Sequence, residues 1–293
     1  MSRRWGIAIA VLSAVCYGAS LPLSRLAYDH GTNALTILTL RYLTIIVVLG
    51  VWLGLTGSTF RMAPRLMLAC AAVGVCFVAV SGGLLASVNF IPVNLTVVVF
   101  YTYPVLTLLV VSAMERRWPT IGQLLAVVLA LLGVGFAMQV SFEHLNAEGV
   151  GFALLAGVGV AGSFVVSSRV LPHVGTTRMT WYACSLAFLA GVAMTVGFDA
   201  LALPTTPFGI GLGAVVVTIF AVAVVSMFVA VRLVGPVRLA TFLCLEPLTA
   251  IFVAVLALGE SLKGGQWVGI ALVGIALLIA SRRGAAQDAD SQY

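Results

Sequence analysis

One acidic residue stands deep inside a long apolar stretch of this sequence. Glu246 lies near the middle of the run from 236 to 257. An ionised side chain is costly in apolar surroundings unless it faces a partner or a wet cavity. Glu246 could therefore bind the ammonium group of a ligand or exchange a proton. The alternative is a structural carboxyl group that caps the backbone groups freed by Pro247.

Arg41 is the basic counterpart of this acid, within the apolar run from 34 to 56. If that run is helical, a rise of about 1.5 Å per residue places Arg41 roughly 10 Å from its nearer end. A guanidinium at that depth could bind a ligand carboxylate or pair with Glu246. It could also snorkel to the nearer surface and anchor its helix. Arg41 and Glu246 are thus our candidates for an ion pair or for coupling.

Aromatic and hydroxyl side chains accompany the two charges. Aromatic rings suit a flat, partly apolar ligand, although they also serve as packing or lipid-facing residues. Serine adds hydrogen bonds, but it often bonds only its own helix. On a continuous helix Tyr101 and Tyr103 point about 200° apart, so both cannot face one lumen squarely. The candidate cavity residues, besides Glu246, are Tyr17, Ser20, Ser81, Asn94, Tyr101, Tyr103, Ser163, Phe164, Ser167 and Ser226.

Three prolines inside apolar runs are candidates for hinges or kinks, namely Pro22, Pro104 and Pro247. Proline removes a backbone hydrogen bond and bends a helix. We predict that Pro104 and Pro247 lie in the middle of helices. There they serve either as mobile hinges or as static kinks that shape a cavity.

The amino-acid composition predicts the kind of secondary structure that positions these residues. Of the 293 residues, 62% are hydrophobic and 8% are charged, whereas a soluble domain is about 25% charged. The mean hydropathy is +1.17, so the bilayer is part of the fold. Strands are excluded because the apolar runs are continuous rather than alternating. An all-α polytopic membrane protein follows, with spanning helices predicted at about residues 5–27, 34–56, 65–88, 92–114, 120–138, 148–170, 177–197, 208–232, 236–257 and 264–282.

Charge between the runs predicts the orientation. With both termini in the cytoplasm, the arginines between runs fall on the cytoplasmic side, and only Arg25 and Lys263 fall outside. That agrees with the positive-inside rule. We therefore predict a multi-pass protein of the bacterial inner membrane.

Several other classes of protein are excluded or disfavoured. The net charge of +6 comes from bases placed in pairs between apolar runs, which is topogenic charge rather than a nucleic-acid stripe. The three histidines fall in predicted loops and no HExxH occurs, no serine stands in a GxSG setting with an intramembrane histidine, and no phosphate-binding loop occurs. We predict no enzyme, no cofactor and no metal, and we interpret the five cysteines as packing residues.

The chain is internally duplicated. Residues 92–96 (PVNLT) match residues 236–240 (PVRLA), and Pro104 matches Pro247. Each half contains five predicted spans, so the second half enters the membrane from the opposite side. We predict an inverted repeat with one unit at 1–140, a second at 141–283, and a disordered cytoplasmic tail at 284–293. Such halves enclose a central cavity and can alternate between two conformations.

The segment Leu245-Glu246-Pro247-Leu248, followed by Glu260 and by Gln266-Trp267-Val268-Gly269, resembles the last two helices of the EamA-type drug/metabolite transporter (DMT) superfamily. The resemblance covers essentially the whole chain, and it is strongest to bacterial aromatic amino acid exporters of the YddG type. It implies a cavity walled mainly by spans 1, 3, 4, 6, 8 and 9, with spans 5 and 10 as peripheral supports.

These observations together predict a secondary transporter that exports small metabolites by alternating access. Amino acids are the expected substrates, aromatic ones first, with threonine and methionine as further candidates. A multidrug or other metabolite exporter of the same fold is the alternative, and a channel fits less well because no filter-like loop or acidic ring occurs. Proton coupling and facilitated diffusion remain open. The expected partners are the substrate and the lipid bilayer, with a monomer favoured over a homodimer.

Overall fold

The computed structural model describes residues 3–139, 145–258 and 263–290, with the backbone alone at 3–4, 257–258 and 282–290. Every regular element in these ranges is an α-helix. The helices are α1 (Arg3–Tyr28), α2 (Ala34–Leu55), α3 (Pro64–Ser87), α4 (Val93–Phe100), α5 (Tyr103–Glu115), α6 (Ile121–Met138), α7 (Ala147–Val174), α8 (Thr176–Gly197), α9 (Pro207–Val234), α10 (Pro236–Leu243), α11 (Glu246–Leu258) and α12 (Gly264–Asp290).

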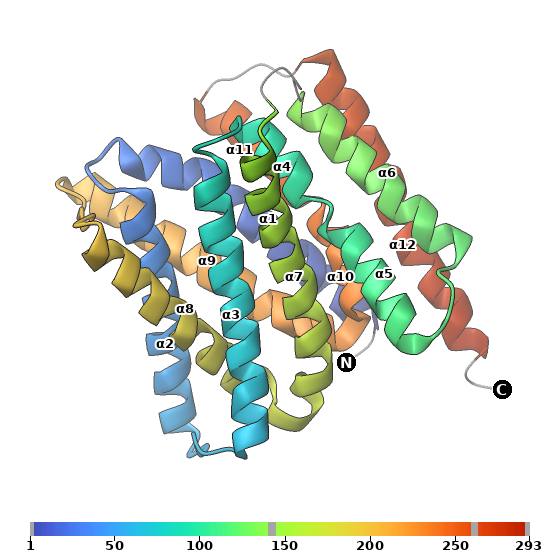
Figure 1. The fold of residues 1–293 in the computed structure, drawn as a ribbon, viewed down its shortest axis with the longest axis horizontal. Coiled ribbons are helices and arrows are strands. Elements are labelled where there is room, and N and C mark those ends of the chain that lie inside the picture. Colours follow the sequence, from blue (N-terminus) through green and yellow to red (C-terminus); the bar gives the residue numbers. More distant parts are fainter. Residues whose placement is uncertain (1–2, 140–144, 259–262, 291–293) are drawn as a thin grey trace.

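These helices form 10 segments that are long and apolar enough to cross a membrane. The number of predicted spans is therefore confirmed. Two spans consist of two helices each, since α4 with α5 and α10 with α11 are each counted as one crossing. An even number of crossings returns the chain to its starting face, and the start of α1 and the end of α12 lie at the same end of the bundle (Figure 1).

Both two-part spans break just before a proline. Proline has no N–H, and its ring clashes with the carbonyl group four residues earlier. In the first break Thr102 N bonds Val99 O at 3.1 Å, and in the second Leu245 N bonds Phe242 O at 3.1 Å. These bonds span three residues instead of four, and they tighten the chain into a turn. The sequence prediction of mid-helix kinks at Pro104 and Pro247 is thus corrected, because each proline lies at the start of a new helix.

The two repeats pack as an inverted pair. Helix α3 of the first repeat packs along α7 of the second, and α1 packs along α9 in the same way. Exchanging the repeats turns one of these pairs into the other. Helices α6 and α12, the last spans of the two repeats, pack together at one side of the bundle (Figure 1). Gly269 permits this contact, since a Cβ there would come within 2.6 Å of Gly133 O.

Helix α12 also corrects a prediction about the end of the chain. It continues to Asp290, whereas we expected a tail without structure from residue 284. Ala285, Ala286 and Gln287 are good helix formers, and no proline follows to stop the helix. Residues 291–293 of the predicted tail lie outside the described residues.

Candidate functional site

A cavity of about 390 Å³ lies between the two repeats. Helices α1, α2, α3, α4, α5, α7, α9, α10 and α11 line it, together with Met138 at the end of α6. All six spans that the family resemblance implied contribute to this wall. The second span contributes as well, through Arg41 and its neighbours, which the resemblance did not imply. Within the described residues α8 and α12 contribute nothing to the lining.

Most of the residues singled out from the sequence meet at this cavity. Asn94 does not, since it is exposed in the first turn of α4. Ser167 and Ser226 are buried away from the cavity, and Pro22 and Pro104 are buried outside its lining too. The predicted residues that line it are Tyr17, Ser20, Arg41, Ser81, Tyr101, Tyr103, Ser163, Phe164, Glu246 and Pro247.

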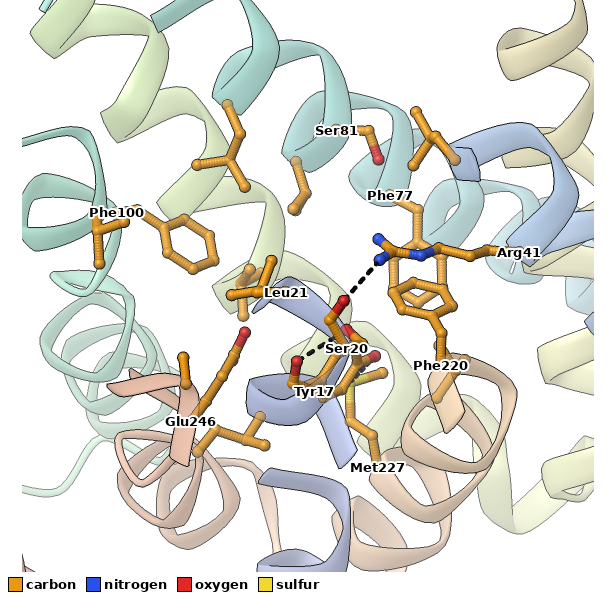
Figure 2. Close-up of a pocket in the computed structure, with 18 of the residues that line it drawn as sticks. Tyr17, Ser20, Leu21, Arg41, Phe77, Ser81, Phe100, Phe220, Met227 and Glu246 are labelled. Atoms are coloured by element: carbon orange, nitrogen blue, oxygen red, sulfur yellow. Dashed lines mark hydrogen bonds between the residues drawn. The ribbon is translucent and has the colours of Figure 1, made fainter. Parts of the chain in front are cut away.

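Arg41 forms one wall of the cavity. Its Nη2 donates to Ser24 Oγ and, at 3.4 Å, to Ser20 O. The guanidinium carbon lies 4.8 Å from the centre of the Phe220 ring, a distance at which a cation is attracted to the aromatic face. Nε has no hydrogen-bond partner. Arg41 therefore points along the cavity wall and does not snorkel to the membrane surface (Figure 2).

The rings around Arg41 form a connected aromatic group. Phe220 packs edge-on against Tyr17 at 5.5 Å and against Tyr42 at 5.9 Å between ring centres. Tyr42 stacks on Phe77 at 6.2 Å, and its hydroxyl group lies 3.2 Å from Ser81 Oγ. These contacts join α1, α2, α3 and α9, so they fix Arg41 against both repeats.

Glu246 forms the opposite wall. It is the first residue of α11, where the positive end of the helix dipole favours a carboxylate. Tyr101 lies beside it and also lines the cavity. Helix α1 approaches this point closely, because a Cβ on Gly18 would come within 2.3 Å of Glu246 O. Figure 2 shows Glu246 and Arg41 on either side of Tyr17, Ser20 and Leu21.

A second aromatic group surrounds Glu246. The ring centres of Tyr101 and Tyr103 lie 5.4 Å apart, and Tyr103 meets Phe164 at 6.0 Å. Phe100 lies 5.3 Å from each of the two tyrosine rings. Both tyrosines line the cavity, although we expected that they could not both face one lumen squarely. That expectation assumed a continuous helix, whereas the chain turns at Thr102 between them.

Some of the predicted serines donate their hydroxyl protons to their own helices, which their residue type alone does not reveal. Ser20 donates to Tyr17 O at 2.8 Å, Ser163 to Val160 O at 2.8 Å and Ser167 to Phe164 O at 3.1 Å. Each hydroxyl proton is used within its own helix, as serine commonly does. Ser20 and Ser163 can offer a cavity ligand only an acceptor oxygen.

Several residues of the site escaped sequence reasoning. Phe220, Phe77, Tyr42 and Met227 line the cavity, and Ser24 holds Arg41. Phe220 and Phe77 stand in uniformly apolar runs, so nothing in the sequence marks the face on which they lie. Tyr42 could have been noticed, because it adjoins Arg41.

The cavity reaches only one face of the membrane bundle. Its lining includes Tyr28, Ala34, Leu85 and Met138, which lie at or near the ends of α1, α2, α3 and α6 on that face. Among the residues that the structure describes, the lining takes none from the other end of these helices.

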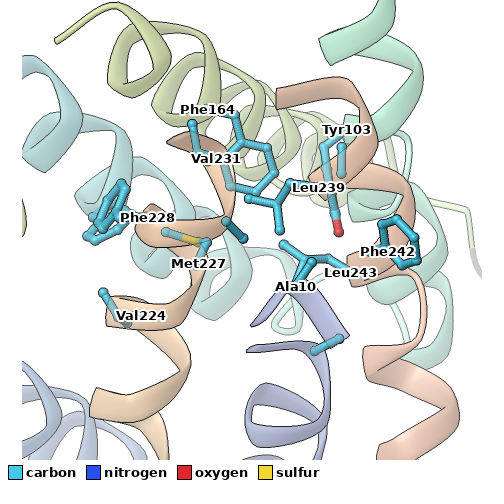
Figure 3. Close-up of a cluster of buried hydrophobic side chains, with 14 of the residues drawn as sticks. Ala10, Tyr103, Phe164, Val224, Met227, Phe228, Val231, Leu239, Phe242 and Leu243 are labelled. Atoms are coloured by element: carbon cyan, nitrogen blue, oxygen red, sulfur yellow. The ribbon is translucent and has the colours of Figure 1, made fainter. Parts of the chain in front are cut away.

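Part of the buried hydrophobic core fills the opposite end (Figure 3). Tyr103, Phe164 and Met227 belong to both the cavity lining and this cluster. Beyond them Phe228 is 0% exposed and Leu239 is 0% exposed. We call the cluster residues beyond the lining, Ala10, Phe228, Val231, Leu239 and Phe242, the sealed end.

The fold and the site define a class, that of polytopic helical membrane proteins with a ligand-sized cavity between inverted repeats. The chain belongs to the EamA-like transporter family, whose pattern matches it twice, at residues 4–139 and 147–282. An uncharacterized transporter of Synechocystis sp. is 24% identical over 199 residues, which make up 66% of this chain and 60% of that protein.

A solved crystal structure of another protein is similar over 95% of this chain and 97% of its own, with a TM-score of 0.77 and 17% sequence identity. At that identity the likeness shows the fold alone. The family is one of transporters.

Proposed function

We propose that the chain is a secondary transporter that exports small metabolites across the bacterial inner membrane by alternating access. Its substrates are amino acids, aromatic ones foremost, with threonine and methionine as further candidates. Both termini lie in the cytoplasm. The observation that carries this proposal is a cavity of about 390 Å³ between inverted repeats that reaches one face and is packed shut toward the other.

The symmetry of the repeats supplies the transport cycle. If each repeat adopts the conformation of the other, the open end closes and the sealed end opens. No covalent step is required. The sequence holds no phosphate-binding loop, so the energy comes from a solute gradient rather than from direct hydrolysis of a nucleotide.

Charge supports the orientation of this cycle. Arg61, Arg65, Arg116 and Arg117 are exposed at the end of the bundle where α1 begins. By the positive-inside rule this end is cytoplasmic. The cavity then faces outward, and the sealed end faces the cytoplasm. The structure corresponds to the state that releases exported substrate.

The size and lining of the cavity support the substrate class. A volume of about 390 Å³ is near the lower end of the range for small-molecule sites, about 300–1,000 Å³. Two aromatic groups on facing walls suit a flat, partly apolar side chain. One cation and one carboxyl group suit a small ligand that carries both charges.

Exchange in proteoliposomes tests the proposal. Vesicles loaded with unlabelled phenylalanine should take up labelled phenylalanine faster than vesicles without protein, with smaller rates for threonine and methionine. Exchange of amphipathic drugs but not of amino acids would favour the multidrug alternative. Ion currents of channel size in a planar bilayer would contradict alternating access.

A further inference from the structure

The cavity has two charged walls, Arg41 and Glu246, that influence each other electrostatically but form no ion pair among the described residues. Arg41 uses Nη2 for both of its hydrogen bonds and leaves Nε without a partner. The side chain beside Glu246 is that of Tyr101, which is neutral. Both charged side chains are partly exposed, and both line the cavity. Figure 2 shows that the edge of α1 bearing Ser20 and Leu21 separates them.

We infer that a substrate is recognised at two points, with its α-carboxylate bound by Arg41 and its α-ammonium group bound by Glu246. This inference rests on the proposed transport of amino acids and names the groups that select them. The side chain of the substrate then lies against the rings that flank the two charges, Phe220 on one wall and Tyr101 on the other.

The carboxylate half of the inference follows from how Arg41 is held. A guanidinium has five N–H donors and accepts nothing, and the two bonds to Ser24 and Ser20 leave several donors unused. Phe220 attracts the cation but supplies no acceptor oxygen. Because Nε itself is buried, a carboxylate would bond the free donors of the terminal guanidinium nitrogens, whose geometry its oxygen atoms match.

The ammonium half follows from the surroundings of Glu246. The carboxyl group lies among tyrosine and phenylalanine rings, and among the described residues no basic side chain bonds it. An ammonium group offers three donors and positive charge. A zwitterion therefore neutralises both walls at once, whereas a ligand with a single charge leaves one wall uncompensated inside the bilayer.

Competition for bound, radiolabelled phenylalanine tests the inference on the purified full-length protein. Phenethylamine lacks the carboxylate, and 3-phenylpropionate lacks the ammonium group. We expect phenylalanine to bind more tightly than either analogue by at least about tenfold, because a site built for a polar group rejects ligands that lack it. Equal affinities for the three ligands would overturn the inference without the need for any variant.

Two variants test which side chain binds which group of the substrate. Arg41→Gln should weaken binding of phenylalanine and 3-phenylpropionate and leave phenethylamine unchanged. Glu246→Gln should weaken phenylalanine and phenethylamine and leave 3-phenylpropionate unchanged. Arg25→Gln and Glu115→Gln are matched controls, since both residues are exposed and lie outside the cavity lining, and they should keep the original pattern.

The outcomes separate this inference from the proposed function. A variant that loses all three ligands to the same extent contradicts the two-point site, because that pattern indicates a general structural effect. Phenylalanine that shows the expected selectivity but is not exchanged in proteoliposomes contradicts transport and leaves the binding site standing. Exchange without selectivity among the three ligands contradicts only the two-point site.

Discussion

The two repeats share one scaffold but carry different chemistry. Each has a fourth span that breaks in front of a proline, yet Tyr103 precedes Pro104 in the first repeat and Glu246 precedes Pro247 in the second. Likewise α2 carries Arg41 in its apolar part, whereas α8, its counterpart, has no charged residue beyond the first turn. The repeat symmetry thus provides the cavity, and the departures from symmetry provide its two charges.

The connections between helices differ as well. Single glycines, Gly175 and Gly235, join α7 to α8 and α9 to α10, with φ of 81° and 82°. The corresponding connections of the first repeat, 29–33 and 88–92, are longer. Glycine tolerates this backbone region where other residues are strained. The two single-residue links therefore lie at the sealed end, and their longer counterparts lie at the open end.

The largest expected effect comes from a residue of the sealed end. Phe228 and Leu84 each stand eight residues before a matched proline, Pro236 or Pro92, but Phe228 is 0% exposed and Leu84 lines the cavity. We expect Phe228→Ala to lower the free energy of unfolding by about 3 kcal/mol, because it leaves a void in packed surroundings. Leu84→Ala should lower the free energy of unfolding much less. Thermal unfolding in detergent measures both, and equal losses would contradict the contrast between the two ends.

A smaller effect is expected where each first helix meets a broken span. A Cβ on Gly18 would lie 2.3 Å from Glu246 O, whereas one on Gly157 would lie 3.1 Å from Phe100 O. We expect Gly18→Ala to destabilise the protein by about 2 kcal/mol through overpacking. Gly157→Ala should be nearly neutral, since the gain in helix propensity offsets its tighter contact. Thermal unfolding in detergent measures the stability of both variants. An unchanged stability of Gly18→Ala would show that α1 can move away from α11.

Replacing Tyr101 tests whether its ring favours aromatic over non-aromatic substrates. Tyr101→Ala removes a ring that contacts Tyr103 and Phe100, and aromatic contacts contribute about 1 kcal/mol. We expect efflux of phenylalanine to fall about fivefold more than efflux of threonine. Tyr101→Phe keeps the ring and serves as the control for the lost hydroxyl group. Equal losses for both amino acids would indicate a structural effect.

The smallest effect concerns two asparagine caps. Asn33 accepts from Thr36 N at 2.9 Å and also donates across the repeats to Ala200 O at 2.6 Å. Asn146 caps α7 through Glu148 N and Gly149 N, within its own repeat. Asn33→Ala should therefore lower stability by about 1 kcal/mol more than Asn146→Ala. Indistinguishable unfolding temperatures would show that the bond to Ala200 adds no stability.

The sequence by itself determined the number of spans and the duplication, because both follow from apolar length and from matched residues such as Pro104 and Pro247. It also indicated Glu246 and Arg41, since isolated charges in apolar runs have few physical explanations. It did not determine which face of a uniformly apolar helix points inward. Phe220 and Phe77 were missed for that reason, and Asn94 was proposed although its side chain is exposed.

Only the tertiary structure decided that Tyr101 and Tyr103 both face the cavity and that Arg41 and Glu246 lie on separate walls. The chain turns at Thr102 because a proline cannot continue the hydrogen-bonded ladder, and where the next helix points depends on what it packs against. The choice of the open end is also tertiary. Two inverted repeats fit together in more than one way, and side-chain packing around Phe228 and Leu239 selects the arrangement seen here.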